Sequence, residues 1–400
     1  MIDVEVVLAG GPQDFAEVRW LMMSGAHHDL GCDLAIRGAD RYGWRPATAR
    51  DPKLVRARKA WFEEHWPAQA GRMRGSALAC SANYEDDTLE LGRVPYLASL
   101  GGCSVAWHPH GRTVDGHGRL SRNYDFSIGT LDEYMATFLA NGPVAGPVAR
   151  PIPKQLPMTA RPYVIETYPE TGYATLLVRA YDLLSGCLDG MNSAGLVVAL
   201  LADRDAVGAR ATGEPCVGVN ELELPHYLLE TCSNVDEALK ALSTLEHYVS
   251  MIPCHFMIAD RTGTSVVWEP FSSKGAAVVP GGGRTQVVTN HQLTRFPSAT
   301  DLPDEAGEGR TYHRLRALAE RVSDGVLDPR QIAEAAAAVR FPMASDGLMV
   351  RTLWNAQYDV ESLALDIEFY LGDDGDSLRY SPRQRLELNR ERFAVSRNAA

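Results

Sequence analysis

Two short stretches limit most strongly how this chain can fold: Gly101-Gly102-Cys103-Ser104 and Arg122-Asn123-Tyr124-Asp125. Residues 103–107 have the alternation of a β-strand, residues 108–118 form a glycine-rich loop, and residues 119–128 have the pattern of the returning strand. Side chains of an antiparallel return strand lie opposite those of the first strand. The pattern therefore predicts a β-hairpin that brings Arg122 and Asp125 close to Cys103.

This grouping predicts nucleophilic chemistry. The thiolate is the reactive form of cysteine, and a neighbouring guanidinium lowers the thiol pKa. A carboxylate such as Asp125 can hold a free α-amino group in place as a general base. Gly101 and Gly102 would allow a strained turn from which the thiol attacks the preceding carbonyl. The competing interpretation is a buried structural cysteine beside a glycine turn.

The composition is that of a soluble globular protein. The chain has 400 residues, of which 45% are hydrophobic and 22% charged, enough for one large domain or two. A net charge of −12 argues against nucleic acid or an anionic membrane as partner. Seven cysteines without Cys-x-x-Cys spacing predict reduced thiols rather than disulfides or a zinc site.

The N-terminus predicts a cytoplasmic protein that does not enter a membrane. Asp3 and Glu5 stand where a signal peptide would carry basic residues. The sequence also lacks a run of about 18 apolar residues, the length that crosses a bilayer.

Residues 1–102 show no catalytic pattern. They predict a strand over 1–10, a helix over 13–42 and a second helix over 52–79. Three aromatic residues of the second helix are expected in the core: Trp61, Phe62 and Trp66.

The remainder alternates strands and helices, which indicates an α+β fold without fixing its layers. The first expected elements are a short helix or strand extension at 130–142, a loop with six prolines at 143–162 and a β-hairpin at 171–205 turning at Asn192–Gly195. Two helices follow within 219–245, with Ser233 and Asn234 as candidate caps of the second. The rest comprises strands within 254–293, helices at 312–325 and 328–340, strands at 351–361 and 364–372, and a charged, partly frayed tail from 373.

Along residues 85–372 the chain resembles the choloylglycine hydrolase and isopenicillin N acyltransferase group of N-terminal-nucleophile (Ntn) hydrolases. The resemblance is carried by the Gly-Cys start, the Arg122–Phe126 box, the Gly-Met-Asn-Ser-Ala-Gly-Leu hairpin, residues 235–239, the His-Phe-Met-Ile-Ala-Asp-Arg-Thr-Gly strand pair, Thr289-Asn290-His291 and residues 352–359. It implies a four-layer αββα sandwich. Residues 1–102 would be a mostly helical prosegment, residues 103–372 the catalytic domain and residues 373–400 a charged tail.

The resemblance also implies roles for individual residues. Cys103 would become the N-terminal nucleophile after cleavage between Gly102 and Cys103. Arg122 and Asp125 would orient it, and the side-chain amide of Asn290 would donate to the oxyanion. The second oxyanion donor falls near Leu201 or Ala202, where a backbone N–H would have to serve.

A second arginine completes the site in both branches of this group. The bile-salt branch has it ahead of a helix, which suggests Arg310 or Arg314. The acyltransferase branch has it at the head of the penultimate strand, where Arg351 lies two residues out of register. A shift of two residues preserves the strand face, so Arg351 is preferred slightly over Arg310.

The predicted function is a self-processing cysteine amide hydrolase or acyltransferase acting on a small-molecule linear amide or acyl donor. Low basic content gives no sign of a coenzyme A site and slightly favours hydrolysis. The prosegment would stay associated with the catalytic subunit. No cofactor and no metal are expected, because the loop residues His108, His110 and His117 are more typical of solvated side chains.

Two other interpretations stay open. In one, the chain keeps the fold but remains uncut and serves as an inactive binding protein. In the other, Cys103 is a thiol nucleophile within an uncut chain, with His255 or His291 as its base.

Overall fold

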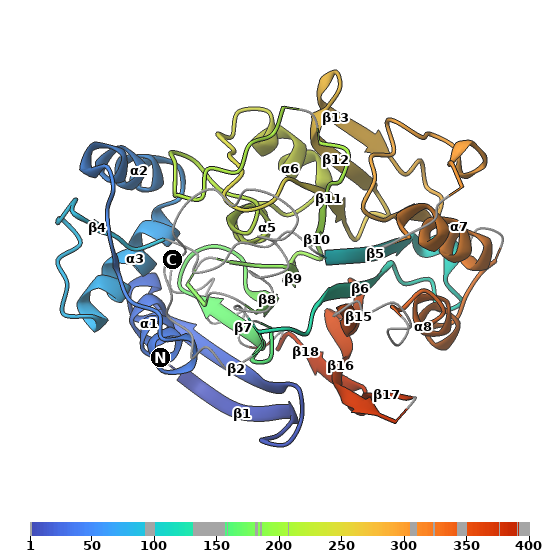
Figure 1. Cartoon of the computed structure of the whole chain (residues 1–400), viewed down its shortest axis with the longest axis horizontal. Helices are drawn as coiled ribbons and strands as arrows, with labels where there is room; N and C mark the ends of the chain where they lie inside the picture. The colour runs from blue at the N-terminus through green and yellow to red at the C-terminus, as the bar shows by residue number, and fades with distance from the viewer. Residues whose placement is uncertain are drawn as a thin grey trace.

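The structure is a computed structural model that describes residues 2–92, 101–130, 157, 159–180, 183–184, 186–206, 208–304, 310–322, 325–341, 350–375, 377–389 and 391. This part is a mixed α+β fold with two large sheets and seven α-helices (Figure 1). None of its helices is both long and apolar enough to span a membrane.

The larger sheet has nine strands in the order β1-β2-β7-β8-β9-β10-β11-β12-β13. Their bounds are β1 Ile2–Gly10, β2 Glu17–Gly25, β7 Tyr163–Pro169, β8 Thr175–Arg179, β9 Asp189–Asn192, β10 Val197–Ala202, β11 Cys254–Ala259, β12 Ser265–Ser272 and β13 Gly275–Pro280. Neighbours run antiparallel except β2 and β7, which are parallel. Helix α5 (Glu223–Thr231) packs on β8, β9 and β10.

The second sheet has seven strands, with β14-β5-β6-β15-β16-β17 in order and β18 also paired to β16. Their bounds are β14 Gln286–Val288, β5 Gly101–His108, β6 Arg119–Ser127, β15 Val350–Asp359, β16 Ala364–Asp374, β17 Ser377–Tyr380 and β18 Gln384–Glu387. Helix α7 (Thr311–Val322) packs on β14 and β5, and α8 (Pro329–Ala337) packs on β6 and β15. A separate short pair joins β3 (Ala47–Thr48) to β4 (Leu89–Glu90).

Two predicted helix starts are confirmed. The Asn234 side chain accepts the Glu237 N–H at the start of α6 (Val235–Leu242). Helix α8 begins with a capping box between Asp328 and Gln331, and Pro329 occupies its first turn.

The predicted β5–β6 hairpin is confirmed, and its register assigns the two faces of the sheet. Cys103 pairs with Tyr124, and both side chains belong to the main core, which includes residues of both sheets. The side chain of Ala106 lies on the opposite face of β5 and packs with residues of α7 and α8. Alternate residues of β5 therefore face the inter-sheet core and the α7–α8 pair.

The predicted helix over 13–42 is wrong in its first part. Residues 17–25 form β2, which lies between β1 and β7, and α1 occupies only His27–Tyr42. A strand at this position is paired on both edges, and this tertiary pairing overrides local helix preference.

The predicted helix over 52–79 consists of two helices, α2 (Pro52–His65) and α3 (Pro67–Ala79). Pro67 lacks the N–H that a continuous helix would need and starts a new helix as its first residue. The three aromatic residues assigned to the core are buried, as predicted: Trp61, Phe62 and Trp66.

One further prediction needs correction. Residues 171–205 contain three strands rather than one hairpin, and the Asn192–Gly195 turn joins β9 to β10. Within the charged tail from 373, β17 and β18 pair with β16. The expected helix at 130–142 and most of the loop at 143–162 lie outside the described residues. All seven cysteines are free thiols, as predicted.

Buried ion pairs join residues 2–92 to the rest of the fold through α5. Glu230 accepts from Arg72 through both nitrogens, at 2.6 and 2.9 Å, and from the Trp66 indole. Arg58 Nη2 lies 2.6 Å from Glu223 Oε1, and Arg58 Nη1 lies 3.0 Å from Glu90 Oε1. Burial raises the pKa of Glu230, but Arg72 outweighs burial and holds that pKa well below the usual carboxyl range.

We predict that Glu230→Gln lowers the free energy of unfolding by about 3–5 kcal/mol, because Arg72 would stay buried without its counter-charge. A depressed folded-state pKa contributes stability above the unfolded pKa, and this is lost as pH falls through the folded value. The difference in the free energy of unfolding between parent and variant should therefore be largest at neutral pH and should shrink as the solution is acidified. Denaturant titration of both in a Cys103→Ala background measures it.

Glu334→Gln is the matched control. Its pair with Arg330 is exposed and lies within one helix, so it should cost no more than about 0.5 kcal/mol. A Glu230→Gln variant as stable as this control would contradict the prediction.

Candidate active site around Cys103

The Cys103 thiol lies in the buried inter-sheet core beside Arg122. Arg122 Nη2 is 3.6 Å from Cys103 Sγ, and Nη1 donates to the Leu200 carbonyl at 2.6 Å. Burial raises the pKa of the Cys103 thiol, and the Arg122 guanidinium works against that rise. The predicted approach of Arg122 to Cys103 is thus present in the structure.

Arg122 is fixed from the opposite sheet by Asp189. Its Nε lies 2.8 Å from Asp189 Oδ2, and neither side chain has any exposure. Asp189 Oδ1 also accepts from the Tyr358 hydroxyl at 2.5 Å, and Oδ2 from the Trp354 indole at 3.4 Å. The arginine beside the thiol therefore has a buried, hydrogen-bonded counter-charge.

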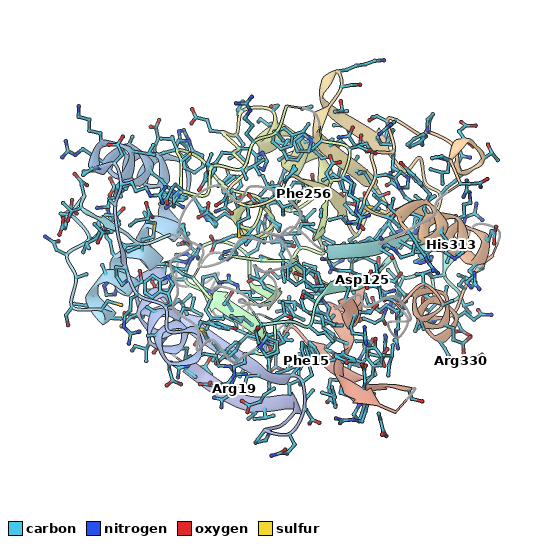
Figure 2. The ribbon with its side chains drawn as sticks, in the orientation of Figure 1. Phe15, Arg19, Asp125, Phe256, His313 and Arg330 are labelled. Carbon is cyan, nitrogen blue, oxygen red and sulfur yellow. The ribbon has the colours of Figure 1, made fainter. Side chains whose placement is uncertain are left out.

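Asp125 lies on the other face of β6, because its position differs from that of Arg122 by three, an odd number. It pairs across the strands with Gly102 and lies near the middle of the molecule (Figure 2). Its Oδ2 is 3.6 Å from Arg314 Nη1, and Oδ1 accepts from Thr352 at 2.5 Å. Asp125 therefore faces the backbone ahead of Cys103 and not its thiol side.

Asn290 lies directly against the backbone of Cys103. Its Oδ1 accepts the Cys103 N–H at 2.8 Å, and its Nδ2 donates to the Ala202 carbonyl at 2.9 Å. The structure thus brings Asn290 to Cys103 and to the Ala202 region named from the sequence.

Arg314 joins these groups from α7. Its Nη2 donates to Asn290 Oδ1 at 2.8 Å, and its Nη1 donates to Ser104 Oγ at 3.0 Å and to the Cys103 carbonyl. One buried guanidinium therefore contacts the Cys103 carbonyl, the Ser104 hydroxyl and the Asn290 side-chain oxygen.

The two arginines preferred from the sequence lie elsewhere. Arg310 is exposed just before α7. Arg351 binds Asp373 through Nε at 3.2 Å and Nη2 at 2.8 Å, at the end of β16. Arg351 pairs across the strands with Phe126, which shares the face of Tyr124 and therefore of Cys103. The Arg351 guanidinium is nevertheless bound to Asp373.

Gly102 lies within the extended strand β5, and its φ is not positive. The strained turn predicted for it is absent. A Cβ at this position would lie 2.7 Å from the Phe341 ring, 3.1 Å from Asp125 Oδ2 and 3.2 Å from Arg314 Nη2. Glycine is required here because other groups approach the backbone closely.

A narrow pocket opens beside the thiol, and the volume open to the centre of a water molecule is about 30 Å³. Its lining is mostly apolar: Cys103, Tyr124, Asp125, Phe126, Leu188, Leu200, Ala202, Leu222, Met251, Ile252 and Cys254. The space next to Cys103 therefore suits an apolar group.

Neither histidine considered as a base contacts the thiol within the described part of the chain. His255 Nε2 is 2.7 Å from the Thr289 carbonyl, and His291 Nδ1 is 3.0 Å from Thr311 Oγ1. Burial lowers the pKa of His291 to about 4. These contacts do not support the uncut thiol enzyme with a histidine base.

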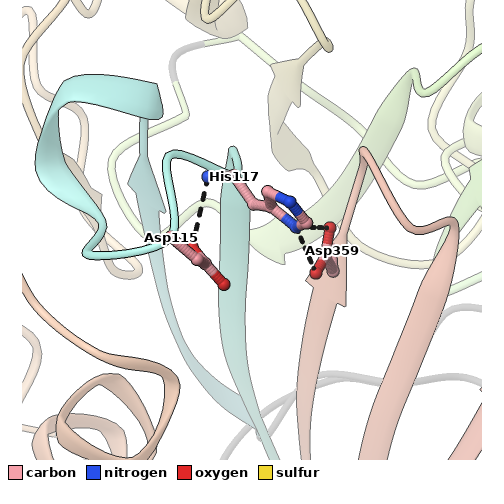
Figure 3. A group of neighbouring side chains, drawn as sticks. All are labelled: Asp115, His117 and Asp359. Carbon is pink, nitrogen blue, oxygen red and sulfur yellow. Dashed lines mark hydrogen bonds and ion pairs between the residues drawn. The ribbon is translucent and has the colours of Figure 1, made fainter.

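The loop histidines are not simply solvated, contrary to expectation. His108 is fully buried, and His110 pairs with Glu361. His117 Nδ1 is 2.9 Å from Asp359 Oδ2, with Asp115 beside them (Figure 3).

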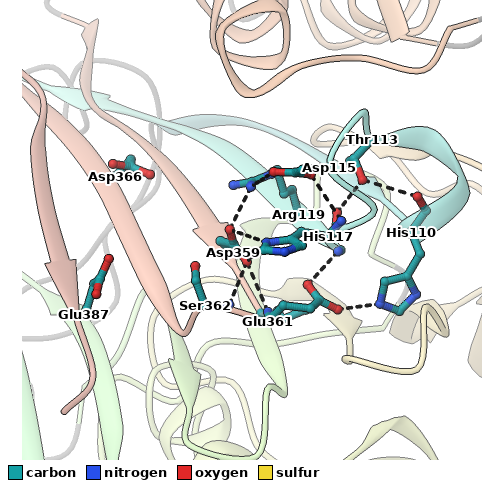
Figure 4. Close-up of polar contacts among 12 residues, drawn as sticks. His110, Thr113, Asp115, His117, Arg119, Asp359, Glu361, Ser362, Asp366 and Glu387 are labelled. Carbon is teal, nitrogen blue, oxygen red and sulfur yellow. Dashed lines mark hydrogen bonds and ion pairs between the residues drawn. The ribbon is translucent and has the colours of Figure 1, made fainter. Parts of the chain in front are cut away.

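Asp115, His117 and Asp359 are close enough to hold a metal ion, but Arg119 already pairs with both carboxylates (Figure 4). A cation there would have to displace the guanidinium, so the donor set does not favour a metal.

Sequence reasoning named Arg314 without preferring it, and it missed Asp189. Arg314 shares the buried face of α7 with Thr311, Leu315 and Leu318, and an arginine on an apolar face is a detectable signal. Asp189 is an acidic residue at the start of a wholly buried strand, but its partner Arg122 lies far away in sequence.

Residues 113–311 match the model of the family described as acyl-coenzyme A:6-aminopenicillanic acid acyl-transferase. No curated protein matches the chain in sequence.

The solved structures similar to this chain include an acylase, a hydrolase and an amidase. Penicillin V acylase from Agrobacterium tumefaciens is 16% identical, with a TM-score of 0.44 over 70% of this chain and 85% of its own. A conjugated bile acid hydrolase variant from Clostridium perfringens is 14% identical, with a TM-score of 0.46 over 72% and 97%. The Caenorhabditis elegans N-acylethanolamine-hydrolyzing acid amidase orthologue is 15% identical, with a TM-score of 0.37 over 64% and 93%. At these values the likenesses carry no argument about activity.

Proposed function

We propose that this chain is a member of the acyl-coenzyme A:6-aminopenicillanic acid acyl-transferase family, whose model matches residues 113–311. We propose further that it is a self-processing cysteine enzyme that hydrolyses or transfers the acyl group of a small-molecule linear amide. The observation that carries the proposal is the environment of Cys103. Its thiol lies 3.6 Å from a buried guanidinium and lines an apolar pocket, while its N–H is bound by Asn290. The inactive binding protein has no observation of this kind in its favour.

Self-processing begins with the thiol of Cys103. The sulfur bonds to the Gly102 carbonyl carbon, the bond to the Cys103 nitrogen breaks, and that nitrogen leaves as an amine that takes up the thiol proton. Water then cleaves the thioester, giving a Gly102 carboxylate and a free thiol. The products are residues 1–102 and a chain that begins at Cys103.

Turnover reuses the same atoms. The new α-amine accepts the thiol proton, the thiolate attacks the substrate carbonyl, and the amine returns the proton to the leaving nitrogen. The acyl group stays on Cys103 as a thioester until water or an acceptor amine takes it.

The surrounding residues stabilise the charges of these steps. Arg122 lies beside the thiolate, and Asp125, on the face of Gly102, is near the position of the freed amine. Asn290 Nδ2 has a second hydrogen besides the one directed at Ala202, which can be donated to an oxyanion. Arg314 contacts Asn290 and Asp125 and keeps both in place.

The pocket favours an apolar acyl group. Leu188, Leu200, Leu222, Met251 and Ile252 surround the thiol, and a charged acyl group there would lose its hydration without gaining a partner among them. Acyl groups wider than the pocket require these side chains to move.

The two products are proposed to stay together as subunits. Arg72–Glu230 and Arg58–Glu223 cross from the first to the second and are buried. The proposed architecture is the αββα sandwich, in which α5 covers one sheet and α7 and α8 cover the other. Residues 103–372 would carry the catalysis, and a cytoplasmic location stays a prediction.

The purified chain is expected to give two masses under denaturing conditions, breaking at Gly102/Cys103, and one assembly under native conditions. Cys103→Ala should remain whole, because alanine has no nucleophile. Intact-mass spectrometry of both proteins measures this. A parent that stays full length and has no amide-cleaving activity would sink the proposed function.

Arg314 and Arg351 should differ sharply in their effect on activity. We expect Arg314→Leu to lower kcat/KM by roughly 10²–10³-fold, since Asn290 and Asp125 lose a shared charged partner. Arg351→Leu should stay close to the parent, because its guanidinium is bound to Asp373. Amide hydrolysis by cleaved samples tests this, and the reverse order would contradict the assignment.

A further inference from the structure

The Thr352 hydroxyl is held from two sides. It accepts the Phe341 N–H at 3.0 Å and donates to Asp125 Oδ1 at 2.5 Å. A hydroxyl has a single proton, so the bond from Phe341 leaves that proton for the carboxylate. Thr352 has no exposed surface.

A β-bulge places Thr352 on the right face for this contact. Thr352 pairs with Asp125 and Trp354 with Tyr124, so Leu353 is an extra residue in β15. Without the bulge, Thr352 would share the face of Trp354, which points into the inter-sheet core.

The other oxygen of Asp125 faces the scissile backbone. Asp125 Oδ2 is buried and has no hydrogen-bond partner among the described residues. It lies 3.1 Å from the position that a Gly102 Cβ would take and 3.6 Å from Arg314 Nη1. A buried carboxylate oxygen normally has a partner, so this one is available for a group that arises in the reaction.

Phe341 ties this arrangement to Gly102 and Arg314. Its N–H fixes the Thr352 hydroxyl, its ring packs against Gly102, and the Arg314 guanidinium lies 5.3 Å from the ring centre. The orientation of the Asp125 carboxylate and the position of the Gly102–Cys103 peptide are therefore set by one connected group.

We propose that Thr352 is a positioning residue for the Cys103 chemistry: its hydroxyl holds one oxygen of Asp125 so that the other is directed at the amine released from the Gly102–Cys103 bond. The proposal rests on the proposed function. Thr352 touches neither the thiol nor the acyl group and acts through Asp125.

Several charged and titratable groups surround Asp125 and set the pKa of its carboxyl group. Burial raises the Asp125 pKa, while Arg314 of α7, Thr352 of β15, Arg122 of β6 and Arg340 lower it; Cys103 of β5 and Tyr380 of β17 are its titratable neighbours. Loss of the Thr352 hydroxyl removes a lowering contribution. Without it the Asp125 pKa would be higher. Cleavage and turnover that need the ionised carboxylate would then be lost at a higher pH when the solution is acidified.

The test compares Thr352→Val, Thr352→Ser and Thr167→Val in the full chain. Thr167 is a matched control, since its buried hydroxyl bonds Thr175 on the other sheet. Intact mass gives the extent of cleavage, and a 4-nitroanilide of a short apolar acid gives kcat and KM across pH 5–9.

Thr352→Val should slow cleavage or kcat by roughly 10- to 100-fold and move the acid limb of the profile to higher pH. Thr352→Ser should restore both, and Thr167→Val should change neither. A merely structural role would not shift the acid limb.

Three results would overturn the proposal. One is a Thr352→Val variant with the parent's cleavage and pH profile. Another is a folded Thr352→Ser variant whose acid limb is displaced to higher pH although its hydroxyl is kept. This second result can be obtained even if Thr352→Val does not fold. The third is a parent that neither cleaves nor turns over, which overturns the proposed function as well and is thereby distinguished from the other two.

Discussion

The buried pair between Arg122 and Asp189 is the interaction on which the site depends. It joins β6 of one sheet to β9 of the other, with a separation of 2.8 Å and no exposure on either side chain. Tyr358 and Trp354 complete the hydrogen bonding of the carboxylate. Removing one partner of such a pair typically costs about 3–5 kcal/mol, so the sheets and the guanidinium beside Cys103 are fixed together.

The two faces of the β5–β6 hairpin divide the proposed chemistry. The thiol and Arg122 face the inter-sheet core and the apolar pocket, while Gly102, Asp125 and Arg314 lie on the face covered by α7 and α8. The Gly102–Cys103 peptide, at which cleavage is proposed, runs between them. In the proposed reaction, a nucleophile on one face and an amine-binding carboxylate on the other would allow a single residue to serve as both nucleophile and base.

Local patterns were sufficient for the hairpin, for the cap at Asn234, for the start of the helix predicted at 328–340 and for the approach of Arg122 to Cys103, because each depends on neighbours in sequence or on strand alternation. They failed where distant pairing decides. Residues 17–25 are a strand because β1 and β7 flank them, and the guanidinium of Arg351 is bound to Asp373 of the neighbouring strand β16. Asp189 could not be assigned a role until both sheets were in place.

The most direct test of the central claim is the mass of the acyl-enzyme. The cleaved protein is mixed with a 4-nitroanilide of a short apolar acid, quenched in acid within the first turnover, digested and analysed by mass spectrometry. The account predicts the acyl mass on the peptide that begins with Cys103, removable by hydroxylamine as a thioester is, with a free α-amine on the same residue. An acyl group on any other peptide, or on a Cys103 still preceded by Gly102, would contradict it.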